Sequence, residues 1–551
     1  DSANNNNAKF EKRKRISDNT TTGSKVNNFL FRCIFTVLAV SVATILFIGS
    51  SKKRSNLVKL RRQDALLSSL VVQKNDNAAV DESGKGGLMK NLNIVSEESD
   101  VKNNQPPLQQ GDAQDRSLLR AEKRPLAQVK KKVEPFTAEE DASLLLTDDS
   151  TKLHVIFSTD CSSYQHWQSY VLFYSALRIK QPGYVTRIAS GCSDEEAKVA
   201  KKWHDEHVTI LSSRFRIHFT PHFSSVTDKE GKQKGDYKYF NKPFGLRHFL
   251  EHDPLMGLDD AGNMKEEDTV IILIDPDMWL LRPIIHDYSN ERDVFIGQRK
   301  RPNRKKKVEH GVPFAQTYGL GMKWLEFPLD YITSDPNSPA KDVVRAEGAL
   351  HYPGGPPYIA TARDMYAISI KWAEFAPRLH EGYPHLLAEM YAYCVAAAHL
   401  RLPHQLVDSI MVSSQQTGGE GWPMVNTIPE DEVCDVAINA DHEKYPIPST
   451  VHYCQRYSVG TWLWAKRKVP HDIFTCESPI FASPPSTDVI NLKHKFENRG
   501  DVKKEMTDKE WKHNAFVVCA LLNGVAEAME FFKEMHCDKE SVNTERTLTL
   551  H

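Results

Sequence analysis

An uninterrupted apolar run at residues 269–274, TVIILI, is followed at once by two aspartates, Asp275 and Asp277. A strand whose side chains are apolar on both faces belongs in the middle of a parallel sheet that helices cover on both sides. In open sheets of this kind, ligands bind outside the carboxyl ends of the strands. We therefore predict that Asp275 and Asp277 lie at the ligand-binding edge of an α/β domain.

Strand and helix patterns alternate upstream of this run. The predicted strands cover residues 153–159, 184–189 and 208–211, with a helix between each successive pair. A capping box from Ser193 to Glu196 begins one helix, and Asn241 begins another. The alternation indicates an α/β domain with a mostly parallel, Rossmann-type sheet, which we assign to residues 151–490. An amphipathic stretch predicts a C-terminal helical extension over residues 491–551.

The N-terminal part of the chain has a different composition. Residues 29–49, FLFRCIFTVLAVSVATILFIG, are apolar apart from Arg32 and match the roughly 20 residues that a transmembrane helix needs. A cleaved signal peptide is the alternative, although its apolar region is normally shorter. We expect a disordered cytosolic tail at residues 1–28 and, because aromatic residues are nearly absent, a disordered stem at residues 50–150. This is the layout of a single-pass type II membrane protein.

Charge and cysteine content narrow the function classes. Lysine plus arginine (71) nearly equal aspartate plus glutamate (72), so the chain lacks the basic surplus that binding to nucleic acid demands, and we expect no nucleic-acid partner. One of the nine cysteines lies in the predicted anchor and eight lie beyond it. An even number is compatible with disulfides in an oxidising lumen, whereas buried free thiols are the alternative.

The two aspartates have the chemistry of a metal site. Carboxylate oxygens are hard ligands that suit Mg²⁺ or Mn²⁺, and such an ion keeps positions open for phosphate oxygens. By itself the pattern is weak, because two acidic residues after a strand often only cap a turn. Phosphotransferases that form an aspartyl-phosphate share it, but they favour Thr or Val where this chain has Trp279.

Several separated blocks of the chain carry a family resemblance. They are YQHWQ at residues 164–168, KQPGYVTR at 180–187, NKPF at 241–244, IDPDMWLLRP at 274–283, EMYAYCVAA at 389–397 and HYCQRYSVGTW at 452–462. In this order, over residues 155–485, they resemble the plant and algal peptidyl glycosyltransferases, namely the peptidyl-serine α-galactosyltransferases and the hydroxyproline O-arabinosyltransferases. The resemblance implies a GT-A-like fold and a UDP-sugar donor, either UDP-galactose or UDP-arabinose. It also implies a serine- or hydroxyproline-containing glycoprotein as acceptor, and retention at the anomeric carbon.

The same resemblance implies roles for individual residues. Asp275 lies near the donor ribose and the metal, Asp277 is a direct ligand of Mn²⁺ or Mg²⁺, and His452 is the candidate third ligand, although a lone histidine is often structural. The candidate donor-binding residues are Asp275, Asp277, Lys242, Lys466 and Trp462. Together with the anchor and stem, this predicts a catalytic domain in the lumen of the Golgi or the ER.

Two further carboxylates are candidate catalytic residues. Glu389 lies in an apolar helical stretch at residues 386–400, where a carboxylate is costly unless it is paired or used. Asp364 is the second candidate, although residues 361–364 also read as an ordinary helix start. The preceding residues 354–357, GGPP, would suit a loop that approaches the acceptor. A non-catalytic relative that binds or scaffolds other proteins is the alternative to an enzyme.

Overall fold

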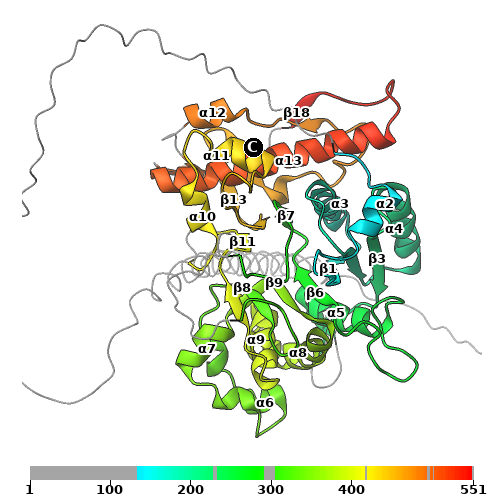
Figure 1. Cartoon of the computed structure of the whole chain (residues 1–551), viewed down its shortest axis with the longest axis vertical. Helices are drawn as coiled ribbons and strands as arrows, with labels where there is room; N and C mark the ends of the chain where they lie inside the picture. The colour runs from blue at the N-terminus through cyan, green and yellow to red at the C-terminus, as the bar shows by residue number, and fades with distance from the viewer. Residues whose placement is uncertain are drawn as a thin grey trace, which may run out of the picture. The chain divides into compact units, whose positions relative to one another are not determined.

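The computed structural model describes residues 133–227, 233–290, 305–415, 418–492, 497–499, 502–504 and 506–548 (Figure 1). The expected tail, the expected membrane anchor and residues 50–132 of the expected stem lie outside these described residues.

A seven-stranded sheet forms the centre of the domain, with the strand order β10-β8-β9-β6-β1-β2-β3. Its strands are β1 (Leu153–Asp160), β2 (Tyr184–Ser190), β3 (Phe215–Thr220), β6 (Val270–Ile274), β8 (Phe314–Thr317), β9 (Gly354–Thr361) and β10 (Gln405–Val407). The β1–β2, β2–β3, β1–β6 and β8–β10 pairs are parallel, whereas β9 runs antiparallel to both β6 and β8. The prediction of an α/β domain with a mostly parallel sheet is confirmed.

Helices cover both faces of the central strand β6. Ile272 and Ile274 belong to one hydrophobic core, which also contains residues of α3 (Ser163–Arg178) and α13 (Asp508–His536). Ile271 and Leu273 belong to a second core, built with α5 (Asn241–His252), α8 (Ala362–Gly382) and α9 (Ala388–His399). Alternate side chains of a strand point to opposite faces, so a strand buried on both faces reads as one continuous apolar run.

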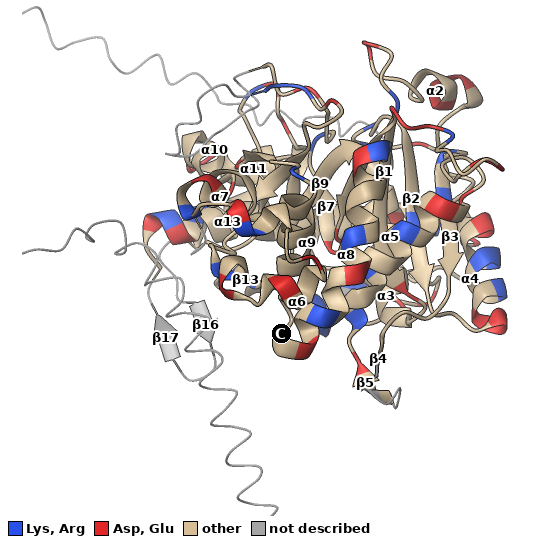
Figure 2. Ribbon diagram, turned by 90° about the horizontal axis from the view of Figure 1, so that it is seen from below, with Lys and Arg blue, Asp and Glu red and all other residues tan. Residues whose placement is uncertain are grey.

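The predicted strand at residues 208–211 is wrong. Helix α4 (Asp194–His207) begins at the predicted capping box of Ser193 and Glu196, and residues 208–211 form the turn that follows it. The side chains of Val208 and Leu211, both in this turn, are buried. The strand β3 begins only at Phe215. Helix α4 carries acidic residues at both ends and lysines between them, including the ion pair of Lys201 with Asp205 (Figure 2).

The folded region begins earlier than residue 151, where we had placed the end of the stem. Residues 133–150 are described, and they include the helix α2 (Ala138–Ser143). The Asp141 carboxylate, 6% exposed, accepts a hydrogen bond from Arg214 Nε at 3.0 Å and another from the Ser213 amide at 2.7 Å. Without residues 133–150, Arg214 would be buried without its carboxylate partner, which is costly. We therefore count this segment as part of the domain.

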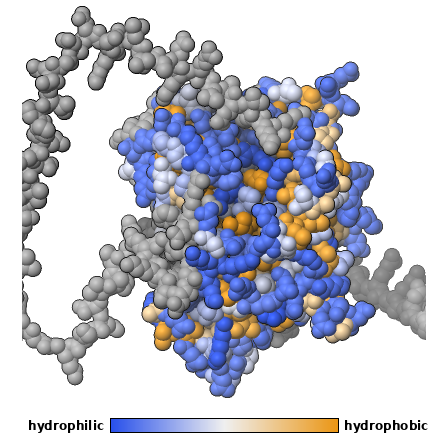
Figure 3. Space-filling model, viewed as in Figure 1, coloured by the Kyte–Doolittle hydropathy of each residue, from blue (hydrophilic) through white to orange (hydrophobic). Residues whose placement is uncertain are grey.

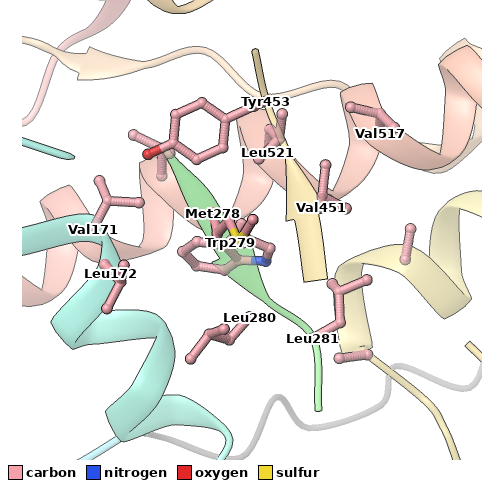
Figure 4. Packing of buried hydrophobic residues seen from close by; sticks show 14 of the residues in the cluster. Val171, Leu172, Met278, Trp279, Leu280, Leu281, Val451, Tyr453, Val517 and Leu521 are labelled. Atoms are coloured by element: carbon pink, nitrogen blue, oxygen red, sulfur yellow. The ribbon is translucent and has the colours of Figure 1, made fainter. Parts of the chain in front are cut away.

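A small second sheet continues the chain beyond the two aspartates. Its order is β11-β12-β7, formed by β11 (Met411–Val412), β12 (Thr450–His452) and β7 (Met278–Leu280). Met278 and Trp279 of β7 pack between Val171 of α3 and Leu521 of α13, next to Val451 of β12 (Figure 4). The strand that leaves the aspartates is therefore fixed by segments from both ends of the domain.

Helix α13 lies within the helical extension that we expected for residues 491–551, and many of its residues belong to the larger hydrophobic core. It is long and apolar enough to cross a bilayer, yet 83% of its apolar window is buried in the domain. A Cβ atom added to Gly524 would lie 2.3 Å from the Trp279 ring, so the helix backbone lies directly against that side chain.

On the face seen in Figure 3, apolar residues (orange) are interspersed among hydrophilic ones.

Three disulfides cross-link the described residues: Cys161–Cys192, Cys434–Cys519 and Cys476–Cys537. The first joins the segments that follow β1 and β2, and the other two tie α13 to the region around it. Cys394 and Cys454 are free thiols, so both sequence-based alternatives hold in part.

The remaining helices are η1 (Lys238–Phe240), η2 (Lys323–Glu326), α6 (Leu329–Thr333), η3 (Pro339–Asp342), α7 (Arg345–His351), α10 (Trp422–Thr427), α11 (Val433–Asn439), η4 (Lys466–Lys468) and α12 (Ser486–Asn491). The remaining strands are β4 (Ser225–Thr227), β5 (Gln233–Asp236), β13 (Arg456–Val459), β14 (Trp462–Ala465), β15 (Ile480–Phe481), β16 (Glu497–Arg499), β17 (Val502–Lys504) and β18 (Arg546–Leu548).

Candidate active site

Asp275, Asp277 and His452 lie together at the carboxyl end of β6. The chain leaves β6 through the two aspartates and enters β7, which pairs antiparallel with β12 so that Met278 faces His452. The Tyr453 amide donates to the Asp277 carbonyl at 3.0 Å, which extends this pairing. His452 Nε2 lies 3.2 Å from Asp277 Oδ1 and 3.8 Å from Asp275 Oδ2. The small second sheet thus brings a residue from far along the chain to the aspartates.

These three side chains fit a divalent ion. Each offers one ligand atom, and the three atoms all lie within 4.8 Å of one another. Two carboxylate oxygens and one imidazole nitrogen form a mixed donor set that suits Mn²⁺ better than an all-oxygen set would. Asp277 and His452 are 5% exposed, so few waters compete for these ligand atoms. The structure contains a possible metal-binding triad at the predicted position.

A lysine neutralises each aspartate. Lys242, in the first turn of α5, places Nζ 2.8 Å from Asp275 Oδ1, and Lys466 of η4 forms an ion pair with Asp277 Oδ2. Burial alone would raise the pKa of Asp277, but the positive charges of His452 and Lys466 outweigh burial and hold this pKa well below its ordinary value. Both lysines predicted to bind the donor therefore border the triad.

Glu389 extends this network of charges. It lies in the first turn of α9, is 1% exposed, and its Oε1 is 3.5 Å from Lys242 Nζ. Burial raises the pKa of Glu389 to about 7, and the negative charge of Asp275 adds to this effect, whereas Lys242 opposes it. No hydrogen bond to Oε1 occurs among the described residues. A buried carboxyl group that has a lysine 3.5 Å from Oε1, close to a possible metal-binding triad, has the features of a functional group.

The candidate catalytic role of Asp364 is not supported, because this residue lies at the opposite edge of the sheet. Strand β9 runs antiparallel to β6, and its last residue, Thr361, pairs with Val270 at the start of β6. Asp364 follows in α8, where its carboxylate accepts a hydrogen bond from the Gly311 amide at 2.6 Å. The alternative reading of residues 361–364 as a helix start is correct. The length of β6 separates Asp364 from the triad, roughly 3.3 Å per residue.

Trp462 lies at the start of β14, partly buried against the hydrophobic core, and Lys466 follows directly after the end of this strand. The role of Trp462 in donor binding stays a prediction.

The sequence analysis missed three residues around the triad. The buried Glu420 accepts hydrogen bonds from the Ser413 amide and hydroxyl, at 2.6 and 2.7 Å. Tyr318 directly follows β8 at the carboxyl edge of the sheet, and Cys454 lies two residues beyond His452. Cys454 could have been suspected from this position. Tyr318 and Glu420 carry no sequence signal, because only the fold brings them here.

Comparison with known proteins finds two similar proteins that share one name. No family model matches the chain. The chain is 24% identical over 343 residues to a peptidyl serine alpha-galactosyltransferase of Arabidopsis thaliana, which covers 61% of this chain. It is 25% identical over 292 residues to a protein of the same name from Chlamydomonas reinhardtii, which covers 50% of this chain. The chain is thus similar in sequence to two peptidyl serine alpha-galactosyltransferases, one from a plant and one from an alga.

This chain spans 34% and 33% of the lengths of these two peptidyl glycosyltransferases. It therefore matches about one third of each. Among solved structures, the apo form of the bifunctional glycosyltransferase WbbM shares 10% sequence identity with this chain at a TM-score of 0.28. The match covers 55% of this chain and 46% of the WbbM chain.

Proposed function

We propose that this peptidyl glycosyltransferase relative is a metal-dependent enzyme with a GT-A-like catalytic domain that transfers a sugar from a UDP-sugar to a hydroxyl group of a protein. The observation that carries this proposal is the convergence of Asp275, Asp277 and His452 at the carboxyl end of β6, with one lysine beside each aspartate. A divalent ion held there supplies a Lewis acid to the donor diphosphate. The amines of Lys242 and Lys466 are placed to neutralise the charge of the leaving diphosphate.

The acceptor follows from the relatives. Both are named for transfer of α-galactose to peptidyl serine, so UDP-galactose and a serine hydroxyl are the first pair to test, and UDP-arabinose with hydroxyproline is the second. We propose that Glu389 stabilises the developing positive charge on the sugar or orients the acceptor hydroxyl. Transfer with retention needs no separate base, because the leaving phosphate can accept the proton of the acceptor.

We further propose that the enzyme acts in the lumen of the Golgi or the ER, attached to the membrane by residues 29–49. Cys161–Cys192, Cys434–Cys519 and Cys476–Cys537 support this, because disulfides persist in oxidising compartments and are rare in the cytosol.

The test is a transfer assay with the full chain in detergent micelles. The protein is incubated with Mn²⁺ or Mg²⁺, a panel of UDP-sugars, and peptides rich in serine or hydroxyproline, and the products are weighed by mass spectrometry. We expect galactose on serine, loss of transfer with EDTA, and recovery with added Mn²⁺. Absence of both transfer and donor hydrolysis with every sugar, in a protein that remains folded, would favour a non-catalytic binding protein.

A further inference from the structure

Tyr318 lies at the same edge of the sheet as the aspartates. It directly follows β8, whose last residue, Thr317, pairs with Gly354 at the start of β9. The same strand β9 pairs on its other side with β6, where Tyr358 faces Leu273. Because β9 runs antiparallel to both neighbours, its first residues lie beside the ends of both. The register therefore places Tyr318, Gly354 and Asp275 on one edge.

The Tyr318 ring rests on the backbone of Gly355. A Cβ atom added at position 355 would lie 2.3 Å from Cδ2 and 2.5 Å from Cγ of this ring, a separation that real atoms do not adopt. The Tyr318 amide donates to the Pro353 carbonyl at 2.9 Å, which fixes the start of the side chain. Glycine is needed at position 355 because of this close approach. Residues 354–357, which from sequence would suit an acceptor loop or a simple turn, begin the strand β9, and Gly355 supports the Tyr318 ring.

The ring also bridges the two hydrophobic cores. Tyr318 packs against both clusters and yet remains partly exposed, so it lies at the surface where the two cores meet. The ring is thus an apolar surface at the edge of the sheet that carries the triad, with a hydroxyl group at its end.

The strand order indicates which part of a donor would meet this ring. The parallel strands β3, β2 and β1 lie on one side of β6, and β9, β8 and β10 lie on the other. The diphosphate belongs at the triad, at the end of β6. If the nucleoside lies over the ends of the parallel strands β1–β3, the donor sugar, at the other end of the diphosphate, lies on the β9–β8 side. Helix α9, which carries Glu389, packs on that side, with Tyr393 stacked on Tyr358 of β9 at 3.8 Å.

We propose that Tyr318 is a sugar-positioning residue: its ring packs against the donor sugar, its hydroxyl group orients the sugar, and Gly355 holds the ring in place. The proposal rests on the proposed function and adds a determinant of donor specificity that lies outside the metal site. Tyrosine suits this role because it joins a flat apolar surface to a polar end.

The test compares UDP with UDP-galactose. Binding of each to the full chain in detergent is measured by calorimetry in the presence of Mn²⁺. Tyr318→Ala is expected to weaken UDP-galactose binding about tenfold while UDP affinity changes less than about twofold. Tyr318→Phe keeps the ring and loses the hydroxyl group, so we expect an intermediate loss. Gly355→Ala should reproduce the selective loss, because the added methyl group displaces the ring.

The control is Tyr331→Phe. Tyr331 lies on α6, is 49% exposed and bonds to Glu381 at the surface. Neither affinity should change in this variant. Thermal unfolding shows whether each protein is folded. If Tyr318→Ala does not fold, the two affinities are compared in Tyr318→Phe instead.

Three results would overturn the proposal. Equal losses for UDP and UDP-galactose would place Tyr318 at the nucleotide, and unchanged UDP-galactose binding in all variants would remove it from the site. If the wild-type protein bound no UDP at all, the proposed function itself would fail, which the first two results do not imply.

Discussion

The two edges of the central sheet differ in how their ionisable residues are used. At the carboxyl edge, Asp275, Asp277 and His452 face one another and share two lysines. At the amino edge, ionisable side chains form separate contacts, such as the ion pairs of His310 with Asp268 and of Lys152 with Glu266. Asp364 accepts from the Gly311 amide, and His404, just before β10, bonds to the Leu402 carbonyl and the Tyr393 hydroxyl group. Convergence, rather than the presence of charged residues, distinguishes the candidate active site.

Asp277 and Asp364 each follow a strand of the central sheet, β6 and β9 respectively. Each carboxylate lies close to the end of an apolar strand. Strand β9, however, is antiparallel to β6, so its carboxyl end lies beside the amino end of β6. The direction of one strand decides which aspartate faces a ligand.

The largest effect is expected from Asp277→Ala. This change removes a metal ligand and leaves His452 and Lys466 without their shared carboxylate, so transfer should fall by about 1,000-fold or more, and Mn²⁺ binding should be lost. Electron paramagnetic resonance of free Mn²⁺ measures the binding, and circular dichroism checks the fold. A folded Asp277→Ala protein with wild-type activity would refute the assignment.

Glu389→Gln should come second. The amide keeps the shape of the side chain but not its charge, so we expect kcat to fall roughly 10- to 100-fold with KM for the donor nearly unchanged. Initial rates over a range of UDP-galactose concentrations separate the two constants. An unchanged kcat would leave Glu389 with a structural role, as a carboxylate that serves only the ion pair with Lys242.

Lys466→Met should separate metal binding from donor binding. In the structure Lys466 pairs with Asp277, so its removal leaves this carboxylate free for the ion. We expect Mn²⁺ alone to bind a few-fold tighter, whereas UDP in the presence of Mn²⁺ should bind about tenfold more weakly. Arg467→Met is the charge-matched control. If Arg467→Met changed the Mn²⁺ and UDP affinities as much as Lys466→Met does, the effect would come from net charge alone.

The amino edge should affect stability rather than turnover. Burial lowers the pKa of His404 to about 4 and that of His154 to about 3, so both are neutral in the folded protein. Unfolded histidines take up protons below about 6.5, so the free energy of unfolding should fall as the pH drops from 6.5 towards 4, by at most about 1.4 kcal/mol per pH unit for each histidine. Urea unfolding at several pH values measures this slope. His404→Gln should flatten it, and His252→Gln, at an exposed position, should not.

Asp364→Ala should have the smallest effect. It removes one hydrogen bond to the Gly311 amide, so we expect a loss of about 1–2 kcal/mol of stability and activity within about twofold of the wild type. Rates measured well below the unfolding temperature test this expectation. A tenfold loss of activity in the folded protein would break the contrast between the two edges.

The sequence predicted those parts of the molecule that local pattern determines. The apolar run before Asp275 is β6, Ser193 begins α4, and Asp275, Asp277, His452, Lys242 and Lys466 do converge. Strand β9 could not be predicted, because its first residues, GGPP, have low strand propensity and become a strand only through pairing with β6 and β8. The position of Asp364 and the role proposed for Tyr318 both depend on that strand. The apolar residues 208–211 were mistaken for a strand because a buried turn leaves the same pattern.

The contact between Gly524 of α13 and Trp279 of β7 has a consequence for the synthesis of the protein. Strand β7 ends at Leu280 and α13 ends at His536, so a ribosome adding roughly 5–20 residues per second completes the helix on the order of 13–50 s after the strand. During that interval the indole ring has α3 on one side but lacks α13 on the other. The segment that carries the aspartates therefore reaches its final packing late in synthesis, and any truncated product that stops before α13 leaves this segment exposed to chaperones and proteases.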